Sequence, residues 1–456
     1  MKVLLIRPPK RHPLELSLPV PPLGLAYIAS SLRASSHQVE ILDCSALNWS
    51  WQKLETYLQR NVVDVIGMTA MSPTWDIVLK AMKLCRPYTK YLVIGGPHPT
   101  SLKEAVFEDC LGLLDAAVVG EGEDVIVQLL AYWAGEISAI PKGVVIPQQP
   151  FVEADVPNIK KIALPARDLL PNHAYRYPFA NHAKIATMIT SRGCPFRCSF
   201  CDKSVSGSQW RFRTAIDVVD EMQMLKTQFN IEFINIYDDN FTLKRSRVID
   251  ICKEILRRGL RISWKCEGRV DNVDQEMLSW MKRAGCRVIA FGVESGNQQA
   301  LDLLRKDITV AQSREAFRLL KQSGIKSLAY IILGVPNETV DDVWQTIRFC
   351  REIQADYVQF SSLSSMPGTS ISEMFTSHAS VYNPLDADNQ RPTLTTLDEK
   401  ELQFLMRAAW RDFYFRPKQL LQMGRDCWQS AYWQAFAHSG ISFLRGLLRD
   451  EESFTK

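Results

Sequence analysis

The chain has 456 residues, of which 46% are apolar and 23% charged, so we expect two or three globular domains with sizeable cores. Its net charge of +4 is small and no basic block is interleaved with aromatic residues, which argues against nucleic acid as a partner. No apolar run approaches the ~20 residues of a membrane span, and the apolar start is too short for a signal peptide, so we expect a cytoplasmic protein without an integral membrane segment.

Residues 1–150 alternate short apolar runs with helical patterns. The apolar runs are bounded by turn residues and lie at Val3–Ile6, Val39–Leu42, Val65–Met68, Tyr91–Ile94 and Ala116–Val119. The helical patterns between them lie at Leu23–Leu32, Leu54–Leu58, Trp75–Leu84 and Val125–Trp133. Short apolar strands that alternate with helices predict a Rossmann-like α/β domain, in which a doubly wound parallel sheet is covered on both faces.

Such a sheet binds ligands at the carboxyl ends of its strands. The loops expected there contain glycines and small polar residues, among them Ser72, Thr74, Gly95, Gly96, His98, Gly120 and Glu121. Glycine lets the backbone pass close to a bulky ligand, and hydroxyl groups supply hydrogen bonds. No GxGxxG motif opens the first helix, which argues against a dinucleotide. Arg7-Pro8-Pro9 stands where a receiver domain would carry an acidic cluster.

A proline-rich connector, residues 151–182, leads to three closely spaced cysteines, Cys194, Cys198 and Cys201. Thiolates are soft ligands that suit iron–sulfur clusters, copper(I) or zinc, but zinc would want a fourth ligand nearby and no second CxxC or His pair follows. The spacing fits a [4Fe–4S] cluster with one open iron better than three buried, inert cysteines. The other eight cysteines are scattered singly, so we expect one cluster only, in a reducing compartment.

This CxxxCxxC motif after a strand resembles that of the radical S-adenosylmethionine enzymes, and Ser191-Arg192-Gly193-Cys194-Pro195 is similar to the family's lead-in. The resemblance implies that S-adenosylmethionine chelates the open iron and is cleaved to a 5′-deoxyadenosyl radical. The turns at Gly95–Pro99 and Val119–Glu123 are similar to those of the cobalamin-binding domain that precedes the barrel in one subgroup. The resemblance extends over roughly residues 1–375 and implies three cofactors: one [4Fe–4S] cluster, S-adenosylmethionine and cobalamin.

One departure concerns the lower face of cobalt. The DxHxxG motif, whose histidine replaces the lower axial base in some cobalamin enzymes, does not occur here, and many members of the subgroup lack it too. His98 has the wrong surroundings for that role, so we interpret it as a turn residue at the corrin periphery rather than as a ligand. We expect the stretch Ser72–Trp75 to lie beneath cobalt.

Residues 183–375 repeat a strand–helix unit six times. The strands are expected at about 185–190, 231–236, 262–267, 287–292, 327–333 and 357–361. This pattern predicts a partial (β/α)6 barrel whose site lies at the carboxyl ends of its strands. Polar residues at those ends are therefore the candidates for contacts with S-adenosylmethionine.

Two acidic residues, Asp238 and Asp239, follow the second of these strands. The resemblance places this corner at the amino group of S-adenosylmethionine, and a cationic amine needs acceptors. The alternative is a helix N-cap, which Asp239 or Asn240 could supply. Both roles can hold together.

Arg269 follows the third strand, at the mouth of the barrel. Its planar fork suits a carboxylate, either of the substrate or of the methionine moiety. An ion pair with Glu267 or Asp271 is an equally open interpretation. After the fourth strand, Glu294 and Ser295 match the family's position for ribose and carboxylate binding, where Glu294 would accept from the ribose hydroxyls and Ser295 would bind the methionine end.

Residues 376–456 form a helical C-terminal region, with helices expected at Leu397–Phe413, Arg416–Met423 and Ser430–Leu448. Its tryptophans and tyrosines could line a substrate pocket, but packing against the barrel is the favoured interpretation because aromatic residues usually dominate cores. The sequence does not indicate which substrate is bound.

The function that these patterns and the resemblance favour is a cobalamin-dependent radical S-adenosylmethionine methyltransferase. It would methylate an unactivated carbon of a small-molecule substrate, a biosynthetic intermediate, through the adenosyl radical and methylcobalamin. An external electron donor such as flavodoxin or ferredoxin is implied. The alternative is a cyclase, oxidative or rearranging enzyme that uses the same cofactors without methylating, and a non-catalytic corrinoid or cluster sensor is disfavoured because the open-iron motif would then have no purpose.

Overall fold

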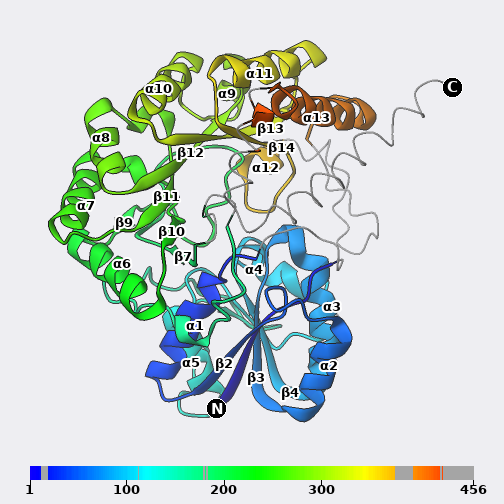
Figure 1. The fold of residues 1–456 in the computed structure, drawn as a ribbon. Coiled ribbons are helices and arrows are strands. Elements are labelled where there is room, and N and C mark those ends of the chain that lie inside the picture. Colours follow the sequence, from blue (N-terminus) through cyan, green and yellow to red (C-terminus); the bar gives the residue numbers. More distant parts are fainter. Residues whose placement is uncertain are drawn as a thin grey trace.

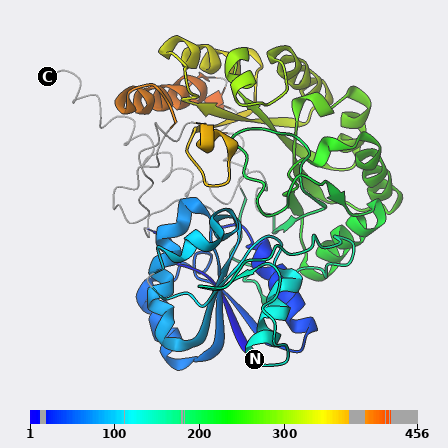
Figure 2. The ribbon, with the colours of Figure 1, turned by 180° about the vertical axis from the view of Figure 1, so that it is seen from behind.

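The computed structural model describes residues 1–11, 19–110, 112–177, 180, 183–374, 394–417, 419–421 and 424. These residues form two parallel sheets that follow each other along the chain, each with its own helices (Figure 1). Helix α4 (Pro97–Leu102) lies on the side of the first sheet that faces the second, as both views show (Figure 2). The carboxyl ends of the first sheet therefore point toward the second part of the molecule.

The first sheet has the strand order β2-β1-β3-β4-β5-β6 and is parallel except for the β5–β6 pair. Its strands are β1 (Lys2–Arg7), β2 (Gln38–Asp43), β3 (Val63–Thr69), β4 (Thr89–Gly95), β5 (Ala116–Val118) and β6 (Val144–Val145). The order reverses at β1, which pairs with both β2 and β3. Doubly wound sheets bind ligands at such a reversal. The five strands expected from the sequence are confirmed, and β6 escaped prediction because two residues carry no readable pattern.

Helices cover both faces of this sheet (Figure 1). One face carries α1 (Leu23–Ala34) and α5 (Glu123–Trp133), and the other carries α2 (Trp51–Arg60) and α3 (Trp75–Cys85). Successive residues of β1 alternate between two cores: Val3 and Leu5 pack into the first, whereas Leu4 and Ile6 pack into the second. Burial on both faces explains why the strand reads as a continuous apolar run.

The second sheet has the order β14-β13-β12-β11-β10-β7, and all of its pairs are parallel. Its strands are β7 (Ile185–Met188), β10 (Phe233–Ile236), β11 (Ser263–Gly268), β12 (Cys286–Glu294), β13 (Lys326–Leu333) and β14 (Tyr357–Ser362). The helices that follow them are α6 (Ala215–Phe229), α7 (Arg245–Arg257), α8 (Gln275–Arg283), α9 (Gln298–Leu303), α10 (Val310–Ser323) and α11 (Val340–Glu352). The curved, six-stranded arrangement confirms the predicted partial barrel, and none of the described helices is long and apolar enough to cross a membrane.

The outer edge of β14 is covered by α13 (Glu399–Tyr414), which falls where the sequence predicts a helix. The Tyr414 hydroxyl donates to the carbonyl of Val358 at 2.6 Å and accepts from its amide at 3.0 Å. Trp410 packs against Phe360, with ring centroids 5.7 Å apart. These aromatic residues pack against the barrel, as predicted, and cover a strand edge that would otherwise be exposed. Trp428, Tyr432 and Trp433, and the helix expected at Ser430–Leu448, lie outside the described residues.

The connector between the two sheets packs tightly, although its sequence has no periodicity. Tyr175 is fully buried and its hydroxyl donates to Asp43 Oδ2 at 3.0 Å. Arg33 of α1 forms a bidentate ion pair with Asp168. Apolar residues of the connector also join the core beneath α1 and α5 to Ile185 of β7. The connector therefore fixes the two sheets to each other rather than tethering them loosely.

Candidate active site

A cleft of about 270 Å³ lies between the two sheets. One wall consists of the carboxyl ends of β3, β4 and β5 and the turn that precedes α5. The opposite wall comes from the barrel and includes Ser191, Arg192, Tyr237 and Asp239. Residues that follow strands of both sheets thus meet at a single cavity, which is where parallel α/β folds place their ligands.

Four of the residues predicted to contact cobalamin line this cleft: Gly95, Gly96, Gly120 and Glu121. Gly96 has a φ of +97°, and a Cβ there would lie 2.6 Å from Thr69 Oγ1. A Cβ on Gly67, which also lines the cleft, would lie 2.8 Å from Leu5 Cδ2. At these two positions a Cβ does not fit, and the glycines let the backbone of the wall approach a bulky ligand closely. This wall suits a corrinoid, the group expected from the sequence.

The other three predicted cobalamin contacts, Ser72, Thr74 and His98, are not among the residues that line the cleft. His98 lies in the first turn of α4, is 1% exposed, and packs against Trp75 with ring centroids 4.4 Å apart. Its Nδ1 is 3.0 Å from Ser72 Oγ, while the buried Nε2 has no hydrogen-bond partner. Burial lowers the pKa of His98 to about 4, so the ring is neutral at physiological pH. The sequence led us to expect His98 in a turn, and its burial against Trp75 shows that the side chain has a packing role.

The three cysteines of the predicted cluster motif lie on one loop between β7 and α6. Cys194 and Cys198 are partly exposed and Cys201 is exposed. The loop is tied down at Ser199, whose amide donates to the carbonyl of Leu304 at 2.9 Å and whose carbonyl accepts from the amide of Ile371 at 2.9 Å. Gly193 has a φ of +83°, and a Cβ there would collide with the carbonyl of Gln209. This glycine is therefore required for the turn that leads into Cys194.

The described residues contain no group of three or more His, Cys, Asp or Glu side chains arranged to hold a single metal ion. A cubane cluster needs no such convergence, because each thiolate binds a different iron and the three sulfurs stand farther apart. Although these residues are exposed or partly exposed at the surface, their thiol groups are largely enclosed by protein. This desolvation raises the pKa of Cys194, and raises that of Cys201 to about 12, so both are thiols until iron displaces the proton. Three soft donors on one anchored loop, with none of them in a disulfide, fit the [4Fe–4S] cluster.

Arg269 extends from the end of β11 to this loop. Its Nη1 lies 3.9 Å from the sulfur of Cys198, and its guanidinium lies 3.6 Å from the centroid of the Phe196 ring. Its Nε and Nη2 donate to Asp271 at 2.9 and 3.1 Å. Of the two predicted ion-pair partners, Asp271 is therefore the one found, while Glu267 pairs with Lys265 instead. The arginine brings a fixed positive charge to the cluster loop.

Glu294 ends β12 with a φ of +63° at an irregularity in the strand register. It is 4% exposed, and its Oε1 accepts a hydrogen bond from Lys306 Nζ at 2.6 Å. A Cβ on Gly292 would collide with Glu294 Oε1, so the glycine makes room for this pair. Burial of Lys306 works against its charged form, but Glu294 raises the pKa of the lysine overall. The two residues form a buried ion pair beside the cluster loop, where Lys306 also lies 5.6 Å from the Phe200 ring.

Ser295 is fully buried in the turn that follows β12. Its hydroxyl lies 2.9 Å from Thr346 Oγ1 on α11 and accepts from the amide of Asn297 at 3.0 Å. These contacts fix the turn and thereby the backbone next to Glu294. The side chain predicted to bind the methionine end is engaged with the protein itself.

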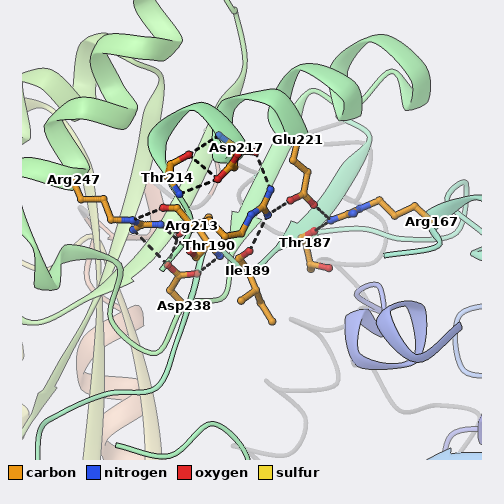
Figure 3. A network of polar contacts seen from close by, with 10 residues as sticks. All are labelled: Arg167, Thr187, Ile189, Thr190, Arg213, Thr214, Asp217, Glu221, Asp238 and Arg247. Carbon is orange, nitrogen blue, oxygen red and sulfur yellow. Dashed lines mark hydrogen bonds and ion pairs between the residues drawn. The ribbon is translucent and has the colours of Figure 1, made fainter. Parts of the chain in front are cut away.

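Asp238 belongs to a buried network at the end of β7 (Figure 3). Its carboxylate accepts from the amide and the hydroxyl of Thr190, both at 2.5 Å, and from the hydroxyl of Ser191 at 2.6 Å. Arg247 of α7 donates to the carbonyl and the hydroxyl of Thr190 at 2.8 and 2.7 Å, and lies 4.0 Å from Asp238. Asp238 thus fixes the segment that leads into the cysteine loop, and its oxygens are already occupied.

Asp239 points the other way and lines the cleft. Its Oδ2 accepts from the amide of Gly193 at 2.8 Å, directly before Cys194, and burial raises the pKa of its carboxyl. The alternative N-cap role is wrong, because neither Asp239 nor Asn240 makes a side-chain capping bond to the helical segments that follow. Of the two adjacent carboxylates, Asp239 is the one available to a ligand.

Two residues of this site escaped sequence-based reasoning. Lys306 follows α9 in a polar turn that carries no motif, and only the fold brings it to Glu294. Arg192 was noted as part of the lead-in to Cys194, but its ion-pair partners, Glu121 and Glu123, lie about 70 residues earlier in another domain. Pairs across such a distance leave no local signal. The only hint was that both segments were expected at strand ends.

Two family models match the chain. Residues 188–350 match the radical SAM superfamily, and residues 14–130 match the B12 binding domain. The first match contains the cysteine loop, Glu294 and Arg269. The second contains the glycine-lined wall of the cleft. Both models thus meet at the cavity that the geometry identifies.

The chain is 32% identical to an uncharacterized methyltransferase of Pyrococcus horikoshii, over 98% of both chains. It is 29% identical to the anaerobic magnesium-protoporphyrin IX monomethyl ester cyclase of Cereibacter sphaeroides, over 80% of this chain and 61% of that protein. Among solved structures, the fold is similar to that of the radical S-adenosylmethionine methyltransferase TsrM from Kitasatospora setae with cobalamin and a [4Fe–4S] cluster bound. The TM-score is 0.68 at 21% identity, with 82% of this chain and 74% of that chain covered.

Proposed function

Because the chain belongs to the radical S-adenosylmethionine enzymes that carry a B12-binding domain, we propose that it transfers a methyl group to an unactivated carbon of a small-molecule substrate. One observation carries this proposal: the glycine-lined edge of the first sheet and the residues around the cysteine loop are walls of the same cleft. A corrinoid in the first wall would face the cluster site across a cavity that a substrate can enter. We propose the domain limits 1–150, 151–182, 183–375 and 376–456.

The residues present fit all three cofactors. Cys194, Cys198 and Cys201 would hold the cluster, and the backbone at Gly95, Gly96 and Gly120 would hold the corrinoid. When bound, the cluster supplies the electron that cleaves S-adenosylmethionine, and the corrinoid carries the methyl group. The protein's task is to place these groups and to exclude competing reactions.

The chain's own side chains provide that placement. Glu294 would accept hydrogen bonds from ribose hydroxyls, with Lys306 holding its charge in place. Asp239 would accept from the amino group of S-adenosylmethionine, and its bond to Gly193 keeps it next to the cysteine loop. Arg269 balances the negative charge of a thiolate-bound cluster. The buried surroundings of Glu294 and Arg269 limit the access of water to the reacting groups.

Radical S-adenosylmethionine enzymes need a reductant, and we propose flavodoxin or ferredoxin as its source. The described cysteines are all free, which supports a reducing, cytoplasmic location where such donors operate. Cys201 is an exposed residue and Cys194 a partly exposed one, so the cluster loop reaches the protein surface. We propose that the electron enters there.

A second candidate function is ring formation without methylation. Its support is the similarity to the magnesium-protoporphyrin cyclase, a protein that matches 80% of this chain at 29% identity. The cofactor residues are the same for both reactions. The fate of the methyl group therefore separates them, and the residues at the cleft do not.

The test uses anaerobically reconstituted protein and S-adenosylmethionine that carries a labelled methyl group. Under reduction we expect 5′-deoxyadenosine to form and the label to appear in the protein-bound corrinoid fraction. Formation of 5′-deoxyadenosine with no label in the corrinoid would overturn the methyltransferase assignment in favour of the second candidate. The Cys198→Ala variant is the control, because it removes a cluster ligand and should produce no 5′-deoxyadenosine.

A further inference from the structure

Four charged side chains join the two domains at one edge of the cleft. Arg192 Nη1 donates to Glu121 Oε2 and its Nη2 to Glu123 Oε1, each at 2.5 Å. Arg211 also pairs with Glu121 and donates to the carbonyl of Pro157 at 2.9 Å. Both glutamates belong to the turn that begins α5, on the corrinoid side. Both arginines belong to the barrel side.

This group of four charged side chains is buried, and its charges cancel. The side chains of Arg192 and Glu121 are 9% and 3% exposed, those of Glu123 and Arg211 7% and 12%. Two positive charges face two negative ones, so the desolvation cost of each is offset by a partner. The Arg192 guanidinium also lies 5.1 Å from the centroid of the Tyr27 ring on α1. Arg192 therefore contacts the start of both helices that flank the cleft on the first domain.

The backbone of Arg192 is tied to the cluster loop. Arg192 lies in β8 (Ser191–Arg192), where it pairs with Arg211 of the antiparallel β9 (Arg211–Phe212). The next residue, Gly193, is held by Asp239, and Cys194 follows. A single residue, Gly193, thus separates Arg192 from Cys194, the first ligand of the iron–sulfur cluster. A shift of Arg192 would move Cys194 with it.

The turn with which Arg192 forms ion pairs is part of the glycine-lined wall, where the corrinoid would bind. Gly120, Glu121, Gly122 and Glu123 all line the cleft. The side chain of Arg192 therefore connects the segment before Cys194 directly to this wall. An arginine suits both bonds, because two separate nitrogens of its planar guanidinium each reach one carboxylate, whereas a lysine presents a single ammonium nitrogen.

We propose that Arg192 is a positioning residue that sets the separation and orientation of the corrinoid relative to the iron–sulfur cluster. This inference rests on the proposed function, since it presupposes both cofactors. It assigns the interdomain ion pairs a role beyond stability. They fix how far the methyl-carrying group stands from the place where the radical forms.

The test measures the distance between the two cofactors directly. Anaerobic protein is prepared with cob(II)alamin bound and with the cluster either oxidised, and diamagnetic, or reduced, and paramagnetic. The electron-spin relaxation of cob(II)alamin is recorded in both states at cryogenic temperature. The extra relaxation caused by the reduced cluster depends steeply on distance, and we expect a single, homogeneous enhancement in the wild-type protein.

Three variants decide the matter. Arg192→Gln alone leaves Glu123 buried without its partner and could unfold the interface, because an uncompensated buried charge is strongly destabilising. Arg192→Gln combined with Glu123→Gln removes both charges and keeps the interface neutral. Arg192→Lys keeps the charge but cannot bridge both glutamates.

We expect the double variant to retain corrinoid and iron at wild-type levels and to lose the homogeneous relaxation enhancement. Arg192→Lys should lie between it and the wild type. The matched control neutralises an ion pair inside the first domain, Arg86→Gln with Asp115→Gln, and should leave the enhancement unchanged.

An unchanged enhancement in the double variant would overturn the inference. So would loss of corrinoid from the double variant with retention in the control, because Arg192 would then be required for binding rather than for spacing. Failure of the wild-type protein to bind corrinoid at all is a different result. It would contradict the proposed function itself.

Discussion

The carboxyl ends of the strands in the first sheet and in the barrel are built on opposite principles. The edge of the first sheet leaves space: Gly67, Gly95 and Gly96 line it, and at two of them a Cβ would collide with a neighbour. The edge of the barrel fills space with charges that are paired and buried, such as Glu294 with Lys306 and Arg269 with Asp271. The first surface can accept a large preformed group against its backbone. The second can bind a small, charged molecule in a fixed orientation.

This contrast teaches where each function is vulnerable. A side chain added to the glycine wall should block a bulky cofactor and leave the barrel unaffected. A charge removed from the barrel edge should weaken the binding of a small ligand and leave the glycine wall unaffected. The predictions that follow test that separation, from the largest expected effect to the smallest.

The largest effect is expected for the cluster ligands. Each of Cys194→Ala, Cys198→Ala and Cys201→Ala removes a thiolate and should abolish reductive cleavage of S-adenosylmethionine, since three thiolates are the least that hold a cluster with one open iron. Cys44→Ala is the control, because this cysteine is buried in the core of the first domain and far in sequence from the loop. Iron content and 5′-deoxyadenosine formation provide the measurement. Full activity in any of the three variants would contradict the assignment.

The next effect concerns the glycine wall. A Cβ on Gly95 would lie 3.7 Å from the carbonyl of Val118, an ordinary contact, so Gly95→Ala should bind corrinoid. Gly95→Leu projects a larger side chain into the cleft and should lose the corrinoid while retaining iron. Corrinoid and iron are quantified on the same samples. Equal corrinoid content in the two variants would show that the ligand does not approach this wall.

A smaller effect is expected at the charged edge of the barrel. Glu294→Gln replaces a charged acceptor by a neutral one and should weaken S-adenosylmethionine binding by roughly 10- to 100-fold, the usual cost of a lost charge-assisted hydrogen bond. Equilibrium dialysis of the anaerobic protein measures the affinity. Corrinoid content should stay at the wild-type level, and Glu352→Gln on the exposed side of α11 should change neither quantity. Loss of corrinoid from Glu294→Gln would contradict the claim that the glycine wall and the charged edge of the barrel act independently.

The last prediction concerns folding stability rather than ligand binding, and is a dependence of stability on pH. Burial raises the pKa of Glu338 from 4.5 to about 7, and its Oε1 has no hydrogen-bond partner. Because the folded state holds this proton more tightly than the unfolded state, stability falls as pH rises from about 4.5 to about 7. Glu338→Gln removes this ionisation. Between pH 4.5 and about pH 7 the free energy of unfolding of the variant should therefore rise, relative to that of the wild type, by up to about 3 kcal/mol.

Urea unfolding at pH 5 and at pH 8 measures this difference. The midpoints of Glu338→Gln and the wild type should differ by more at pH 8 than at pH 5. The exposed Glu315→Gln serves as the control and should show no such trend. A wild-type advantage that grows with pH would contradict the expected direction.

Much of the fold follows from local sequence. The strands that read as apolar runs are found where they were predicted, because burial on both faces selects apolar residues at every position. At the start of α11, Thr339 forms a capping box with Asp342, three residues further along the chain. The cysteine loop was evident because three ligands of one cluster fall within eight residues. In each case the interacting residues are close along the chain.

The parts that were not predicted depend on distant contacts. Asp238 and Asp239 are adjacent and chemically equal, yet one is consumed by Thr190 and Ser191 while the other lines the cleft. His98 was interpreted as a turn residue at the corrin periphery, and it lies buried against Trp75. Neither outcome can be read from neighbours in sequence. The packing of α3 and β7 decides them.

The most direct test of the account is a cofactor count on a single sample. The protein is produced with cobalamin supplied, purified anaerobically, and analysed for corrinoid, iron and sulfide. The account predicts about one corrinoid and about four irons and four sulfides per chain, as expected for one cubane cluster beside one cobalamin. Four irons without any corrinoid would contradict it, leaving a radical enzyme whose first domain binds some other ligand.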